Sequence, residues 1–314
     1  MRSRFLPYLA LAGGILALSF SPIFVRWAEA PGPVTSFYRM TTAALVLAPF
    51  ALRLLARSGT LTGVNTLTGA NVRPGANPLL LGLLGGLLTA GDHGFWSTAL
   101  GSTSVANATL FNYIAPLWVA LFAALVWRER LHPRFWFGLA LVLTGMAVTL
   151  PGAGGASLPV AGGASLQAGM QGTFRFNPGD VFAVISSFFY AAYFLVAQRG
   201  RRQLPTLAFI WLVALGAALG LLAVCLALRL PLTGYPPTTY LAFLTAGLFS
   251  QIGGYFMVAY ALGHLSAAVV APTMIAQPVL SALLAIPIAG ELLSAGQILG
   301  GLSVLAGIAV VNRE

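Results

Sequence analysis

The chain has 314 residues, of which 58% are hydrophobic and 7% are charged, and its formal net charge is +10. Soluble domains carry about 25% charged residues, and disordered chains combine low hydrophobicity with high charge. The composition therefore excludes both classes and favours a membrane protein. All the basic residues are arginines that lie between apolar segments, not in a basic stripe, so we expect no nucleic-acid partner.

Cysteine and histidine usage excludes several kinds of site. Cys225 is the single cysteine, which rules out a disulfide framework and a multi-cysteine metal site. The three histidines show no metal-ligand spacing. We therefore expect no metal and no cofactor.

Long apolar segments recur along the whole chain, and a membrane-spanning helix needs roughly 20 such residues. The runs are continuously apolar, which excludes the alternating pattern of barrel strands. The sequence predicts an all-α integral membrane fold with ten transmembrane helices, at residues 7–28, 34–56, 79–100, 104–127, 135–150, 180–199, 206–229, 239–263, 266–289 and 295–312. The sequence Ala28-Glu29-Ala30 resembles a signal-peptide cleavage site, but Pro31 follows it, so we expect the first segment to be retained.

The arginines are distributed unequally between the two ends of these segments. With the N-terminus inside, the outer side holds only Arg26, Arg175 and Arg229, whereas most of the others fall on the inner side. Positive residues accumulate on the cytoplasmic side of membrane proteins. We therefore expect a multi-pass protein of a bacterial plasma (inner) membrane, with both termini cytoplasmic.

The two halves of the chain are similar to each other. Residues 104–149 align with 266–311 without a gap, and the alignment matches Pro116 with Pro278, Glu129 with Glu291, Gly138 with Gly300 and Gly145 with Gly307. We predict a first five-helix repeat at 1–150, an outer Gly/Ala/Ser-rich linker at 151–178, and a second five-helix repeat at 179–314. Five is an odd number, so the sequence predicts two inverted five-helix repeats.

The repeated unit also resembles a known family. It consists of an apolar helix with a central proline and a glutamate at its end, followed by a helix with regularly spaced glycines. Outside this unit, Arg39 follows Pro31 and Pro33, and Gly179-Asp180 opens the sixth segment. In these features the chain resembles the drug/metabolite transporter superfamily, in its ten-helix EamA-type branch. The resemblance implies a ten-helix carrier, and several members export amino acids and related metabolites. The 151–178 insertion and the Asp92-His93 pair depart from the family pattern.

Only three ionisable residues lie clearly within the predicted spans: Arg39, Asp92 and His93. Charged groups there are costly, about 2.5–3.5 kcal/mol on insertion scales, and mark functional sites. Arg39 is predicted to contact a substrate carboxylate or an acidic partner; alternatively it extends to the outer interface. Asp92 and His93 are predicted to bind substrate or to carry a proton, which leaves proton coupling open. Alternatively, Asp92 forms a structural bridge with Arg39, or the third span bends at Gly91 and Gly94 and exposes the pair to water.

Aromatic and amide residues complete the predicted substrate site. Asp92 and Trp96, Ser186 and Tyr190, and Gln251 and Tyr255 share helix faces at a spacing of four residues. The remaining candidates are Asn112, Tyr113, Thr273 and Gln277. Aromatic residues with few polar anchors suit an amphipathic organic solute, although each of these side chains could instead serve interhelical packing.

Prolines and glycines suggest how the helices bend and pack. Pro116 and Pro278 lie in the middle of equivalent spans, where each is predicted to kink its helix and act as a hinge, or as a static bend that shapes the site. The small-residue pairs Gly82/Gly86, Gly216/Gly220 and Gly296/Gly300 allow close helix contact, within one monomer or across a homodimer.

These features predict a secondary transporter that works by alternating access. It would move a small organic metabolite, such as an amino acid or a drug-like solute, outward across the inner membrane. The alternative is a lipid-linked flippase or a membrane accessory protein of the same fold. We expect no enzyme, because Asp92 has no second aspartate at its depth and the spans hold no serine–histidine or metal constellation. The substrate, the coupling ion and the roles of the 57–78 and 151–178 loops stay open.

Overall fold

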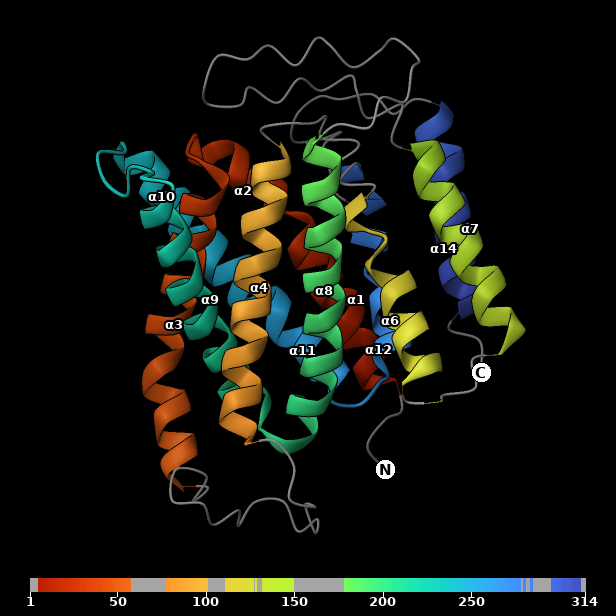
Figure 1. Cartoon of the computed structure of the whole chain (residues 1–314), viewed down its shortest axis with the longest axis horizontal. Coiled ribbons are helices and arrows are strands. Elements are labelled where there is room, and N and C mark those ends of the chain that lie inside the picture. The colour runs from red at the N-terminus through yellow and green to blue at the C-terminus, as the bar shows by residue number, and fades with distance from the viewer. Residues whose placement is uncertain are drawn as a thin grey trace.

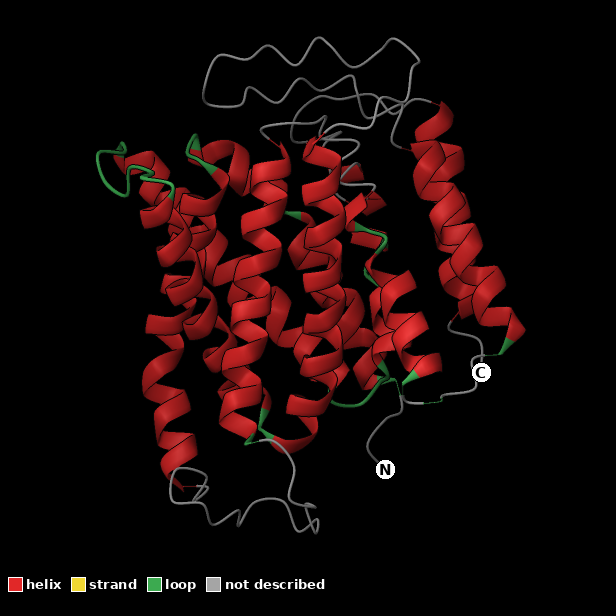
Figure 2. Cartoon of the chain, viewed as in Figure 1, coloured by secondary structure: helices red, strands yellow, loops and turns green. Residues whose placement is uncertain are grey.

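The computed structural model describes residues 5–57, 77–100, 111–126, 128, 132–149, 178–277, 279–280, 283–284 and 295–311. Every regular element in these residues is a helix (Figure 2). The all-helical part of the prediction is therefore confirmed for the described residues.

The helices follow the predicted segments closely. The first half contains α1 (Leu6–Ser19), α2 (Ser21–Ala28), α3 (Gly32–Arg57), α4 (Pro78–Leu100), α6 (Ala115–Leu125) and α7 (Pro133–Thr149). The second half contains α8 (Pro178–Gln203), α9 (Thr206–Ala227), α10 (Pro237–Thr245), η3 (Ala246–Gly254), α11 (Tyr255–Leu262), α12 (Ala267–Thr273) and α14 (Ala295–Val311). The predicted spans 104–127 and 266–289 are only partly covered by the described residues.

Four of the described helices are long and apolar enough to cross a membrane. They run over Gly32–Arg57, Pro178–Gln203, Thr206–Ala227 and Pro237–Leu262. Large apolar side chains point outward around the bundle, and Leu45, Leu80, Leu125, Leu241 and Leu299 are each more than 60% exposed. An apolar exterior of this kind suits lipid as the surrounding solvent.

Two predicted spans whose residues are all described, 7–28 and 239–263, are not single α-helices. The first is divided at Phe20 into α1 and α2, and Pro22 lies in the first turn of α2, where its missing N–H group costs no helical hydrogen bond. The eighth continues without interruption from α10 to α11, but its central part, η3, is a π-helix. Residue periodicity predicts a helical face and does not reveal either irregularity.

Helices α4 and α9 lie close together and run in the same direction. A Cβ atom on Gly86 would lie 2.5 Å from the Val213 carbonyl oxygen and 2.8 Å from the Cα atom of Gly216. One on Gly82 would lie 2.6 Å from Leu212, and one on Gly220 2.6 Å from Ala90. The glycine pairs of α4 and α9 thus form a contact within one chain.

Several helix contacts show the same pattern in both halves. Helix α4 packs against α8 and α9, and its counterpart in the second half, η3 with α11, packs against α1 and α3. The pairs α3–α9, α6–α12 and α7–α14 join counterparts directly, and α7 and α14 lie side by side at one edge of the bundle (Figure 1). These particular contacts are therefore unchanged when the two halves are exchanged.

Helices α7 and α14 run in opposite directions. The Ser303 hydroxyl donates to the Leu141 carbonyl at 3.1 Å, and a Cβ atom on Gly307 would lie 2.6 Å from the Gly138 carbonyl. Later residues of α14 therefore face earlier residues of α7.

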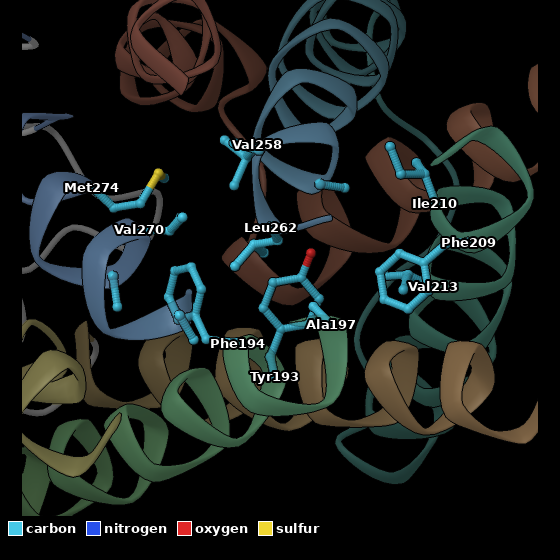
Figure 3. Packing of buried hydrophobic residues seen from close by; sticks show 14 of the residues in the cluster. Tyr193, Phe194, Ala197, Phe209, Ile210, Val213, Val258, Leu262, Val270 and Met274 are labelled. Atoms are coloured by element: carbon cyan, nitrogen blue, oxygen red, sulfur yellow. The ribbon is translucent and has the colours of Figure 1, made fainter. Parts of the chain in front are cut away.

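The largest apolar core joins helices of the second half to α1 and α3. Figure 3 shows Phe194 of α8, Phe209 of α9, Leu262 of α11 and Met274, which follows α12, as parts of this cluster. These side chains are at most 2% exposed. The core packs beside the polar residues described next and holds their helices in place.

Candidate functional site

Arg39 lies on α3 in the interior of the bundle and is 6% exposed. Its Nη1 atom donates to the hydroxyl of Ser21 at 2.9 Å, and its Nη2 atom contacts Nε2 of His93. Its Nε atom has no hydrogen-bond partner among the described residues. The guanidinium is thus buried between α2, α3 and α4, and does not extend to the outer interface.

Asp92 on α4 is the acidic centre of the same region. Its Oδ1 atom accepts hydrogen bonds from Nδ2 of Asn112 at 2.9 Å and from the hydroxyl of Ser186 at 2.6 Å. The Asn112 amide also donates to the Ser186 hydroxyl at 2.5 Å. The three side chains come from α4, from the helical residues 111–112 before α6 and from α8, and each of these residues is at most 9% exposed. They form a closed hydrogen-bonded triangle.

His93 connects Arg39 to Asp92. Its Nε2 atom faces Arg39, and its Nδ1 atom lies 3.4 Å from Oδ2 of Asp92. The direct bridge between Arg39 and Asp92, considered as an alternative from the sequence, is not among the ion pairs of the described residues. The neighbouring Asp92 and His93 have different main partners, but the imidazole also turns back toward the carboxylate.

We call the connected side chains of Ser21, Arg39, His93, Asp92, Asn112 and Ser186 the central network. Four of its members are predicted site residues, and Ser186 was predicted as a neighbour of Tyr190. Ser21 was missed, because serine is common in helices and nothing in the sequence relates it to Arg39. The break between α1 and α2 brings its hydroxyl to the guanidinium.

Three tyrosines lie around the central network. Tyr255 on α11 is within electrostatic range of both Arg39 and Asp92. Tyr113 and Tyr190 are each within range of Tyr255 and Asp92. All three are partly buried, and the ring of Tyr190 lies 4.8 Å from that of Phe194. The structure therefore places the predicted residues Tyr190 and Tyr255 close to the charged groups.

Two predicted site residues are not joined to the network by the contacts of the described residues. Trp96 lies one turn beyond Asp92 on α4 and is partly buried. Gln277 instead donates from its side-chain Nε2 atom to the Leu18 backbone carbonyl at 3.4 Å, and the backbone carbonyl of Gln277 accepts from the Ser19 hydroxyl at 3.2 Å. Gln277 therefore contacts the end of α1.

The predicted kink at Pro116 needs a correction. Pro116 is the second residue of α6, and the residues before it, 113–114, form a turn. A proline in the first turn removes no helical hydrogen bond, so the span is interrupted before Pro116 and is not kinked at it. Its counterpart Pro278 lies outside the described residues, and the hinge role of both prolines remains a prediction.

The π-helix η3 passes directly beside the segment of α3 that carries Arg39. A Cβ atom on Gly247 would lie 2.6 Å from Thr42 and 3.1 Å from the Arg39 carbonyl. Gln251 on η3 is 1% exposed, and its Oε1 atom has no hydrogen-bond partner among the described residues. Short π-helical segments inside α-helices occur frequently at functional sites, and the nine-residue η3 accompanies the central network.

Replacing Asn112 with leucine is expected to destabilise the protein by about 1–3 kcal/mol, because Asp92 would lose a buried hydrogen-bond donor. The control is Thr89→Val on α4, whose hydroxyl donates only to the Gly85 carbonyl of its own helix at 2.9 Å. Thermal unfolding of the detergent-solubilised proteins measures the difference. Equal melting temperatures for the two variants would contradict a stabilising role of the Asn112–Asp92 bond.

No group of three or more His, Cys, Asp or Glu side chains that could hold a metal ion occurs in the part of the chain that the structure describes. The central network offers a cation, a carboxylate, hydroxyls and an amide to a ligand. It can therefore recognise a small polar or charged group by hydrogen bonds and charge, with aromatic rings nearby.

The comparisons with known proteins agree with this architecture. The profile of the EamA-like transporter family matches residues 5–150 and 177–313. A solved crystal structure of a protein shares the fold with a TM-score of 0.71, at 23% sequence identity, over 99% of this chain and 98% of the other. No sequence among the curated proteins matches the chain. The family match covers both halves, and the chain is therefore a multi-pass membrane protein that belongs to the EamA-like transporter family.

Proposed function

We propose that the protein is a secondary transporter that moves a small organic metabolite, such as an amino acid or a drug-like solute, by alternating access. One observation carries the proposal: a network of ionisable and polar side chains is buried where helices of both halves meet. Arg39, His93 and Asp92 come from the first half, whereas Ser186 and Tyr255 come from the second. Ionisable groups inside a membrane bundle usually mark the path of a substrate or ion.

The arrangement of the two halves supports alternating access. We propose that residues 1–150 and 179–314 are inverted five-helix repeats joined by the linker 151–178, with ten spans in total. The direct contacts between the counterpart helices α3 and α9, and the opposite directions of α7 and α14, favour this interpretation. Inverted repeats have two related packings, and exchanging them exposes a central site to one side and then to the other.

The membrane and the direction of transport are further parts of the proposal. The arginine distribution favours cytoplasmic termini in a bacterial inner membrane. Export is proposed because the family resemblance includes exporters of amino acids and related metabolites. The energy for transport would come from a transmembrane gradient or from the exchange of solutes.

Counterflow in proteoliposomes tests the proposal. Vesicles that contain the protein are loaded with one unlabelled amino acid, amine or drug and diluted into the labelled compound. A carrier that alternates between two sides accumulates label transiently above equilibrium, whereas a channel only equilibrates it. Absence of transport for every compound under every imposed gradient would overturn the proposal.

Sidedness tests the inverted arrangement separately. Cys225→Ala gives a cysteine-free background. In this background Arg57→Cys places a single thiol at the last residue of α3, and Arg229→Cys places one just after α9. Both positions are exposed. Inverted repeats place these equivalent connections on opposite sides, so an impermeant thiol reagent added outside cells should label only position 229. Labelling of both positions from one side contradicts the inversion.

A further inference from the structure

We infer that the central network takes a small organic monocarboxylate together with one proton, and that His93 receives this proton. The inference rests on the proposed function, because it assumes that the central network is the transport site. The contacts of Arg39 and His93 and the charge balance of the buried groups lead to it.

The contact between Arg39 and His93 suits one tautomer of the neutral histidine. A guanidinium has only donors, so the Nε2 atom that it contacts must accept. An accepting Nε2 atom carries no proton. In that tautomer the imidazole is neutral and carries its one proton on Nδ1, 3.4 Å from Oδ2 of Asp92.

The central network is electrically neutral in this state, with one cation at Arg39 and one anion at Asp92. The helices packed against α4 are α3, α8 and α9. From α3, Arg39 faces His93, and Tyr38 points away to the Leu232 carbonyl. From α8, Tyr190 lies near Asp92. Helix α9 carries no charged residue, and its titratable residue Cys225 packs in another cluster.

The remaining charged groups on α8 lie toward the ends of that helix. Asp180 is in its first turn, six residues before Ser186, or about 9 Å along the axis. Arg201 lies in its last turn and donates to the carbonyls of Ala259 and Leu204. The tyrosines near the network, Tyr113, Tyr190 and Tyr255, are uncharged donors. The balance at the site is therefore set by Arg39, His93 and Asp92.

The pattern of contacts favours an anionic ligand over a cationic one. Oδ1 of Asp92 already accepts two hydrogen bonds, and His93 lies at Oδ2. The guanidinium of Arg39 touches a hydroxyl and a neutral imidazole but no carboxylate among the described residues, and its Nε atom has no partner there. A carboxylate binds the planar guanidinium through two parallel hydrogen bonds. The carboxylate of the ligand would replace His93 as the partner of the Arg39 Nη2 atom.

The charge balance explains why a proton accompanies the carboxylate. A carboxylate that binds alone leaves the buried site with a net charge of −1, which is unfavourable in a medium of low dielectric constant. A proton that moves from solvent onto Nε2 of His93 restores neutrality. The imidazolium can then donate from Nε2 to the bound carboxylate and pair through Nδ1 with Asp92. The proton returns to solvent when the solute leaves, and no covalent bond changes.

Calorimetry with matched ligands tests the inference. The full-length protein in lipid nanodiscs is titrated with acetate, hexanoate, benzoate and phenylacetate, and with the amide of each acid, in buffers that differ in ionisation enthalpy. We expect uptake of about one proton per carboxylate bound. Wherever binding takes up one full proton, the affinity should weaken by about tenfold for each unit of pH rise. The neutral amides should not bind.

Two variants and a control separate the roles of the residues. His93→Gln keeps an acceptor toward Arg39 but cannot take the proton, so proton uptake and the pH dependence of affinity should disappear. Arg39→Gln should remove carboxylate binding. Thr89→Val, with its hydroxyl bonded within α4, should behave as the unaltered protein and control for folding.

Several results would overturn the inference. These are carboxylate binding without proton uptake, an unchanged pH dependence in His93→Gln, or binding of the amides as tightly as the acids. If none of the carboxylates binds but the proteoliposomes still move an amino acid or an amine, the inference fails and the proposed function stands. If counterflow fails for every compound, the proposed function itself fails.

Discussion

Transport should fall by about 100-fold or more when Arg39 is replaced with glutamine. Hydrogen bonds to charged groups contribute about 1.5–3 kcal/mol each, and a carboxylate would lose two of them, which corresponds to at least two powers of ten in affinity. The transport rate of Arg39→Lys should lie between those of Arg39→Gln and the original protein, because lysine keeps the charge but lacks the planar pair of donors. Initial rates of counterflow in proteoliposomes measure the effect.

A second buried arginine provides the matched control. Arg201 is 8% exposed, but its guanidinium donates to the backbone carbonyls of Ala259 and Leu204. Arg201→Gln should lower the melting temperature and leave the solute affinity of the folded protein unchanged. If Arg39→Gln transports at the original rate, or if both variants lose affinity equally, Arg39 has no specific role in solute binding.

Replacing Gly86 with valine should destabilise the protein by about 3 kcal/mol, at the upper end of the range for overpacking. The atoms nearest to an added Cβ are the Val213 carbonyl oxygen at 2.5 Å, the Ala217 nitrogen at 2.8 Å and the Gly216 Cα atom at 2.8 Å. All three belong to the backbone of α9, so no side-chain rotation can relieve the contact. Helices α4 and α9 would have to move apart.

The control for this substitution lies on the same helix. A Cβ atom on Gly94 would meet only the Val224 side chain, at 3.7 Å, which is an ordinary contact distance. Gly94→Ala should therefore be neutral or slightly stabilising, because alanine favours the helix over glycine by up to about 1 kcal/mol. Thermal unfolding in detergent distinguishes the two. Equal stability of Gly86→Val and the original protein would mean that α4 and α9 are not in close contact.

The sequence by itself determined the class of the protein and most of the central network. Apolar runs long enough to span a bilayer must be helical, because lipid offers no partner for backbone groups. Ionisable residues are rare at that depth, so Arg39, Asp92 and His93 stood out against an apolar background. The internal repeat was also evident from the positions of a few prolines, glutamates and glycines.

The tertiary structure decided how these residues meet. Helical periodicity assigns a residue to a face, but the partner on the next helix depends on how the two helices cross. The sequence therefore did not reveal that His93 lies between Arg39 and Asp92, that Ser21 reaches the guanidinium, or that Gln277 contacts the end of α1. The π-helix and the start of α6 at Ala115 were also hidden, because backbone breaks depend on tertiary packing as well as on residue type.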